Sequence, residues 1–284
     1  MALTKVLVTV KTYPNLSLKY TELVCTAGLR EDGSWIRIHP VPYRMLDHEK
    51  QWYKKWQWIE ADLVKNERDF RVESYRLADI NTLKVLERID SKKTNWELRR
   101  KYALKQGFYT NLGKLIDKAK AENISLAVFK PKRILDCICK PAEKGDWDSK
   151  KLSKIKANLM QQDLFEEMAI KRSFEIAKKI PYVFSYKFET EDGSEPCLMI
   201  EDWELGALYL NCLKRGDSVA LSCEKVKAKY MQMARDNDLY LFLGTTYRHH
   251  KNGKNPFIIV GVFAPPYVPK PPKIVQGELF PESI

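Results

Sequence analysis

The sequence lacks the features that assign a chain to several familiar classes. No apolar run approaches the roughly 20 residues needed to span a bilayer, and the first ten residues lack the long apolar core of a signal peptide. A Gly-rich phosphate loop and a Gly-x-Ser-x-Gly nucleophile elbow are both missing, which disfavours nucleotide hydrolysis and serine-hydrolase chemistry. The six cysteines are scattered and form no Cys-x-x-Cys pair. We therefore expect a cytoplasmic protein with no membrane partner and no metal site.

Positive charge is what the sequence has in excess. Lys and Arg number 49 against 37 Asp and Glu, a net charge of +12, and residues 84–133 hold 14 basic against 5 acidic side chains. Such an excess is typical of proteins that bind a polyanion. We expect nucleic acid as the partner, DNA rather than RNA, with Arg99, Arg100 and Lys101 as contacts in the basic stretch.

The order of apolar patterns predicts an α+β fold. Residues 1–144 read as a β-rich domain resembling a small barrel, with a basic helical insertion, and residues 145–180 as a helical connector. In residues 181–268 two strands are followed by two helices, which we predict at 203–214 and 224–235, and then by two more strands. Strands and helices thus segregate rather than alternate strictly, which indicates the α+β class. Residues 269–284 are predicted to be a mobile, proline-rich tail. We expect the two domains to have separate cores.

Aromatic and basic residues are interleaved in the first domain. Their pattern suits a surface that stacks bases and neutralises phosphates. Alternation places Trp56 and Trp58 on one face of a strand, which favours a core position for both. The candidate contacts to nucleic acid in this region are Arg37, Tyr43, Arg44, Lys54 and Lys55.

Three acidic residues, Glu201, Asp202 and Glu204, cluster where a predicted strand meets a helix. Such a cluster can hold Mg²⁺ for phosphodiester cleavage, and Mg²⁺ is the one cofactor that we expect if the protein is a nuclease. Capping of the helix by Asp202 is the simpler interpretation. His249 and His250 lie among basic residues and are predicted to form a solvated turn.

The C-terminal residues Gln276-Gly-Glu-Leu279-Phe280 form a Gln-x-x-Leu-Phe motif. It resembles the short peptide by which bacterial replication and repair proteins dock on the β sliding clamp, although Glu278 replaces the more usual Ser or Asp. The resemblance implies that Gln276, Leu279 and Phe280 bind the clamp. A second copy, residues 161–165, lies inside a predicted helix over 155–175.

These observations lead to one preferred hypothesis and two alternatives. The preferred one is a nucleic-acid-binding accessory protein of DNA replication, repair or defence, recruited to the sliding clamp. The first alternative is a Mg²⁺-dependent nuclease or another nucleic-acid-modifying enzyme. The second is a β-barrel that reads RNA or a modified base, which requires an aromatic pocket.

Overall fold

The computed structural model describes residues 3–42, 53–92, 95–165 and 176–268. Within these residues fourteen strands form three sheets, accompanied by five α-helices. The predicted α+β class is confirmed. None of the described helices combines the length and apolar character needed to cross a membrane.

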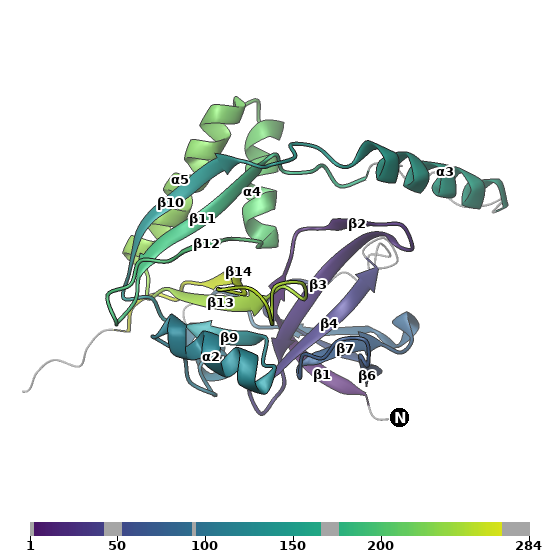
Figure 1. Cartoon of the computed structure of the whole chain (residues 1–284). Helices are drawn as coiled ribbons and strands as arrows, with labels where there is room; N and C mark the ends of the chain where they lie inside the picture. Colours follow the sequence, from purple (N-terminus) through teal and green to yellow (C-terminus); the bar gives the residue numbers. More distant parts are fainter. Residues whose placement is uncertain (1–2, 43–52, 93–94, 166–175, 269–284) are drawn as a thin grey trace, which may run out of the picture.

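The largest sheet forms a half-barrel from the first part of the chain (Figure 1). Its strand order is β6-β7-β4-β3-β1-β5-β8, with β2 paired to β3 outside this path. All pairs are antiparallel except β4 with β7. The strands are β1 (Thr4–Lys11), β2 (Asn15–Ser17), β3 (Thr21–Leu29), β4 (Trp35–Pro42), β5 (Gln57–Ala61), β6 (Leu63–Lys65), β7 (Ser74–Leu77) and β8 (Lys84–Arg88).

Two three-stranded antiparallel sheets complete the fold. One has the order β14-β13-β9 and the other β10-β11-β12. Their strands are β9 (Leu126–Phe129), β10 (Arg133–Pro141), β11 (Tyr182–Glu189), β12 (Cys197–Met199), β13 (Tyr240–Thr245) and β14 (Phe257–Phe263). The helices are α1 (Asn95–Ala103), α2 (Leu112–Glu122), α3 (Ser149–Phe165), α4 (Trp203–Lys214) and α5 (Val219–Asp236).

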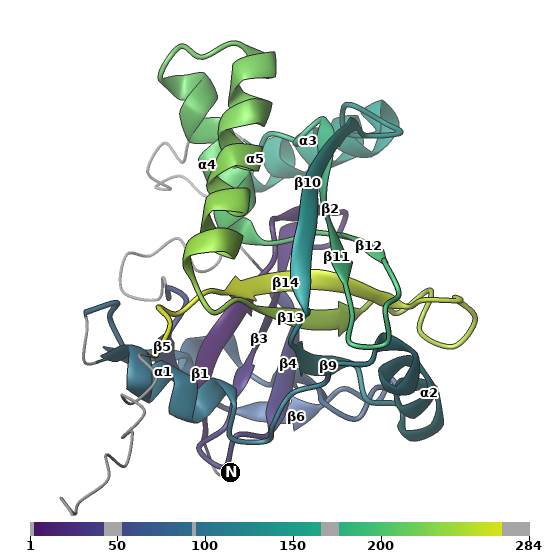
Figure 2. The same ribbon diagram turned by 90° about the vertical axis from the view of Figure 1, so that its left-hand side faces the viewer.

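The third sheet rises from the rest of the molecule with α4 and α5 on one face (Figures 1 and 2). Tyr186 on β11 anchors this layer, because its buried hydroxyl donates to the carbonyl oxygen of Tyr230 on α5 at 2.7 Å. Helix α3 projects to the side (Figure 1). Its link to the half-barrel includes a 2.7 Å bond from Lys151 Nζ to the carbonyl oxygen of Leu16 on β2.

The predicted strands and helices are largely found, but the predicted division of the chain is not. Strand β9 pairs with β13 and β10 pairs with β11, so residues 126–141 belong to sheets of the second half rather than to the first domain. The expected separation of the two cores is not found either. One core cluster unites Leu7 and Trp56 with Phe242 and Phe263.

Phe242 lies at the centre of this shared core and is fully buried. Its ring packs edge-on against Trp35 at 5.4 Å between centroids and stacks on Phe263 at 5.9 Å. Trp56 also contacts it, and both Trp56 and Trp58 are buried, which confirms their predicted core position. Aromatic packing of this kind holds the half-barrel against the β14-β13-β9 sheet.

Replacing Phe242 with alanine tests whether the core is shared. We expect Phe242→Ala to lower the free energy of unfolding by about 3–5 kcal/mol because a large cavity is left. Chemical denaturation should still show one transition, shifted as a whole. The exposed Leu18→Ala control should change stability by less than about 0.5 kcal/mol. Two transitions, of which only one shifts, would contradict a common core.

Candidate nucleic-acid interface

Two of the predicted phosphate-binding cations are buried and committed to other partners. Arg37 is 5% exposed and donates to Cys25 Sγ and to the carbonyl and hydroxyl oxygens of Ser125, at 3.2–3.3 Å. Lys55 is 7% exposed and forms an ion pair with Asp202. Neither side chain faces solvent. Both predictions are therefore corrected: these cations serve packing of the fold rather than an external anion.

The cations predicted on α1 divide into buried and exposed ones. Arg99 is buried, donates to the carbonyl oxygen of Ile89 and lies over the Trp56 ring at 4.9 Å. Arg100 forms a 2.6 Å ion pair with Asp238. Only Lys101 of the three is exposed. The basic stretch at 84–133 therefore contains many cations that the fold itself uses, so its charge count overstates its surface charge.

Of the other predicted contacts, one is exposed and the rest lie outside the residues that the structure describes. Lys54 is exposed and its side chain has no recorded partner among the described residues. Tyr43, Arg44 and the clamp-like residues Gln276, Leu279 and Phe280 lie outside the described residues. The same holds for the side chains of the second motif copy at 161–165, whose backbone forms the end of α3. Clamp binding stays a prediction from the sequence.

The carboxylate of Asp202 has no free position for a ligand. Its two oxygens accept hydrogen bonds from Lys55 Nζ, from the backbone amide of Glu204 and from the backbone amide of Val262, at 2.8–3.2 Å. The bond from the Glu204 amide is the predicted N-cap of α4, which is thereby confirmed. Four accepted bonds occupy the lone-pair directions that Mg²⁺ would need.

The two neighbouring acids differ from Asp202. Glu204 is 63% exposed and accepts from Lys55 Nζ at 3.0 Å. Although burial alone would lower the pKa of Lys55, the carboxylates of Asp202 and Glu204 raise it above its usual range. Glu201 is half-buried, and no partner of its side chain is recorded among the described residues. Nowhere in the described ranges do three His, Cys, Asp or Glu side chains gather as they would around a metal ion.

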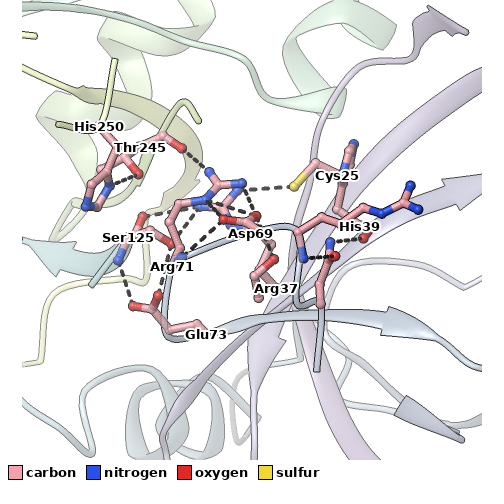
Figure 3. A network of polar contacts seen from close by, with 12 residues as sticks. Cys25, Arg37, His39, Asp69, Arg71, Glu73, Ser125, Thr245 and His250 are labelled. Carbon is pink, nitrogen blue, oxygen red and sulfur yellow. Dashed lines mark hydrogen bonds and ion pairs between the residues drawn. The ribbon is translucent and has the colours of Figure 1, made fainter. Parts of the chain in front are cut away.

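A buried polar network ties the half-barrel to the β14-β13-β9 sheet (Figure 3). Arg71 forms an ion pair with Asp69 at 2.6 Å and donates to the carbonyl oxygen of Thr245 at 2.8 Å. Glu73 accepts from the backbone amide and hydroxyl of Ser125, at 2.8 and 3.0 Å. These contacts cross from the segment before β7 to β13 and to the start of β9. They position residues 64–76 against the β14-β13-β9 sheet.

His250 belongs to the same region and corrects the predicted solvated turn. It is fully buried, with its ring nitrogens 2.7 Å from the Thr245 hydroxyl and 3.1 Å from the Ala119 carbonyl oxygen. Burial lowers its pKa, so the neutral ring is favoured. His249, in contrast, is exposed as expected.

A hollow of about 710 Å³ lies beside this network, and we name it the basic groove. It is formed by the β2–β3 turn, by strands β4, β6 and β7, and by the segment that follows β6. Four cationic side chains and one acidic side chain line it. The lining residues are Lys19, Tyr20, Pro40, Val64, Lys65, Asn66, Glu67, Arg68 and Arg76.

The cations of the basic groove are available to a ligand. Lys19, Lys65, Arg68 and Arg76 are all exposed, and no carboxylate partner is recorded for any of them within the described residues. Lys65 lies over the Tyr75 ring at 5.0 Å and donates to the carbonyl oxygens of Arg71 and Val72, which leaves its charge uncompensated. The groove therefore presents four cations against the single exposed carboxyl of Glu67.

Sequence reasoning missed this groove for a physical reason. Residues 65–76 contain Lys65, Arg68, Arg71 and Arg76 but also Glu67, Asp69 and Glu73, so the local charge is nearly balanced. Folding buries Asp69 with Arg71 and turns Glu73 toward backbone amides, which removes two of the three acids from the surface. The remaining exposed side chains are mainly basic.

Two family models match the chain. The first, described as Domain of unknown function (DUF8758), covers residues 2–105, and the second, Domain of unknown function (DUF8757), covers residues 110–283. The chain thus has two domains that meet before α2, earlier than the predicted boundary at residue 144. No curated protein matches the chain.

The Lys55–Asp202 pair is expected to be structural, which a double-mutant cycle can measure. Lys55→Met leaves Asp202 buried without its counter-ion and should cost about 3–5 kcal/mol of unfolding free energy. Asp202→Asn should also destabilise, and the double variant should lose less than the sum of the two. Additive losses in urea denaturation would show that the two groups do not interact. Added Mg²⁺ should leave the wild-type midpoint unchanged.

The Asp69–Arg71 pair predicts a specific acid sensitivity. Burial opposes ionisation, but hydrogen bonds from Arg71 and Ser74 hold the pKa of Asp69 at about 2, below its ordinary value of 3.8. A lowered pKa stabilises the fold fully above about pH 4, and this stability is lost as the pH falls toward 2. We expect about 1–2 kcal/mol of unfolding free energy to disappear over this range.

Asp69→Asn should remove that acid-dependent component and lower stability at neutral pH, since Arg71 loses its buried partner. Asp117→Asn is the matched control, because Asp117 is exposed on α2 and has no recorded partner among the described residues. Urea unfolding at a series of pH values measures both. If Asp69→Asn keeps the wild-type pH profile, the pair does not supply the acid sensitivity.

Proposed function

The chain belongs to the DUF8757 family, and we propose that it binds nucleic acid through the basic groove. The observation that carries this proposal is the set of exposed cations, four against one carboxyl, around a 710 Å³ hollow. Phosphate oxygens are the ligands that such a set attracts, and arginine binds them in a bidentate manner. The nucleic acid would release its condensed counter-ions when these cations neutralise its phosphates.

The composition of the groove favours single-stranded nucleic acid. Tyr20 lines it next to Lys19. An aromatic ring beside a cationic track is characteristic of proteins that bind single strands, where unpaired bases stack on the ring. The cations would attract the phosphates, and Tyr20 would offer a stacking surface to a base.

We propose an accessory rather than a catalytic role. The saturated carboxylate of Asp202 argues against the nuclease alternative, because the central acid of the predicted cluster has no position left for Mg²⁺. Work in DNA replication, repair or defence, with recruitment to the sliding clamp through Gln276, Leu279 and Phe280, is a proposal that rests on the Gln-x-x-Leu-Phe motif alone.

Charge removal in the groove tests the proposal. Arg68→Ala combined with Arg76→Ala should weaken binding of a single-stranded oligonucleotide. If each arginine contacts one phosphate, the slope of log K against log salt concentration should fall in magnitude by about 1.4 on single strands. Fluorescence anisotropy at four or more salt concentrations measures the slope.

A matched control removes two arginines elsewhere. Arg215 and Arg235, at the ends of α4 and α5, are exposed and have no recorded side-chain partner in the described ranges. Arg215→Ala with Arg235→Ala changes the net charge equally and should leave the slope close to that of the wild type. If the two double variants changed the slope equally, the groove would contribute no more to binding than any other charged surface does. Salt-independent binding, or none, by the wild type would refute the proposed function.

A further inference from the structure

A second hollow, of about 190 Å³, is lined by residues at the start of β2. Residues 13–15 line this hollow, which we name the aromatic cavity, and residues 19 and 20 line the basic groove. A few residues of chain therefore separate the two, a span of less than about 20 Å. A single nucleic-acid strand that occupies several nucleotides can reach both.

Aromatic rings form much of the wall of this cavity. Tyr13, Trp147, Tyr182 and Phe184 all line it. The polar edges of two rings are held in place, because Tyr13 Oη donates to the carbonyl oxygen of Lys178 at 2.7 Å and Trp147 Nε1 donates to that of Ala177 at 2.9 Å. These bonds hold the polar edges of the two rings in place.

The position of Tyr13 also depends on a glycine in α4. A Cβ atom at Gly206 would lie 2.6 Å from the Tyr13 ring and 2.7 Å from the Ile180 side chain, both of which line the cavity. Glycine therefore lets these two side chains approach the helix backbone. The wall of the cavity is a defined packing arrangement rather than a gap between loose side chains.

Glu201 lines the aromatic cavity together with the polar residues Asn15, Lys179 and Asp202. Its backbone is fixed, since the amide of Ile200 donates to the carbonyl oxygen of Phe184 and the amide of Glu201 to that of Ile259, both at 2.8 Å. The next residue, Asp202, is held by Lys55. The half-buried side chain of Glu201 has no recorded partner among the described residues, and burial raises the pKa of its carboxyl. Such a group is prepared to bind hydrogen-bond donors of a ligand.

Charge at the wall argues against a cationic ligand. Lys179 lines the cavity, and its Nζ lies 5.5 Å from the centroid of the Trp147 ring. The ammonium group of Lys179 repels a second cation, although an aromatic wall with the carboxyl of Glu201 would otherwise suit a quaternary ammonium group. Lys179 therefore favours a neutral ring that carries a phosphate.

Size and chemistry together indicate the class of ligand. A volume of 190 Å³ is smaller than the roughly 300–1,000 Å³ of drug-sized pockets, and it suits a single heterocyclic ring system. We propose that the aromatic cavity binds one unstacked nucleobase, with Glu201 accepting hydrogen bonds from the base's exocyclic amino group. The choice of a base rests on the proposed function. Bases with an amino group, such as cytosine and adenine, are therefore preferred over uracil and thymine.

Mononucleotides test the cavity directly because they are too short to occupy the basic groove as well. Cytidine monophosphate should quench tryptophan fluorescence saturably, and a Trp147→Phe variant should lose most of this response. Cytidine monophosphate should bind about tenfold or more tightly than uridine monophosphate, as expected for a well-formed contact to a base edge. Glu201→Gln should abolish this preference. Glu191→Gln, an exposed carboxyl on the β11–β12 turn with no recorded side-chain partner in the described ranges, should retain it.

The outcomes separate this inference from the proposed function. The Arg68→Ala, Arg76→Ala variant should keep the cytidine preference while its salt slope on oligonucleotides falls. If mononucleotides give no saturable response, or if Glu201→Gln keeps the preference, the cavity does not read a base. Quenching by tetramethylammonium in place of nucleotides would also overturn the inference, because it assigns the cavity to a cationic ligand. Salt-independent oligonucleotide binding alongside an intact cytidine preference would refute only the groove.

Discussion

The buried ion pair of Asp69 with Arg71 is the contact on which the candidate interface depends. The guanidinium of Arg71 also donates to the carbonyl oxygen of Thr245, so the Arg71 side chain joins the half-barrel to β13. Glu73 repeats the connection at Ser125. A buried ion pair contributes little net stability, but the loss of one partner leaves the other charge buried without a counter-ion and destabilises the fold strongly. Such a pair therefore fixes the positions of the segments that it joins. Here it fixes the segment that carries Lys65, Arg68 and Arg76.

Two neighbouring acids have different roles at the start of α4. Asp202 is a helix cap, the counter-ion of Lys55 and an acceptor for the Val262 amide. Because these donors satisfy it, Asp202 holds the strand-to-helix junction, whereas the adjacent Glu201 lines the aromatic cavity without a recorded side-chain partner among the described residues. An acidic cluster that resembles a metal site in the sequence thus contains one structural acid and one acid available to a ligand. Their separate roles follow from packing, which no local sequence pattern reports.

Much of the fold was predictable from the sequence, and much of the interface was not. Periodicity located β14, both α4 and α5, and the core positions of Trp56 and Trp58 because these features are local. The pairing of β9 with β13 joins residues more than a hundred positions apart and leaves no local pattern. Charge counting favoured 84–133, yet Arg99 and Arg100 are used internally, whereas the nearly balanced residues 65–76 expose most of their cations. The surface charge of a segment therefore depends on which of its charged residues are buried or paired in the folded protein.

The basic groove is the proposed binding surface for a single nucleic-acid strand. Photo-crosslinking can locate a bound strand: a single-stranded oligodeoxynucleotide containing 5-bromodeoxyuridine is irradiated with the wild-type protein, and the modified peptides are identified by mass spectrometry. Adducts should concentrate on the peptide that contains Tyr20 and on the peptides around Arg68 and Arg76. Adducts confined to residues 84–133, or to α4 and α5, would contradict the groove as the binding surface.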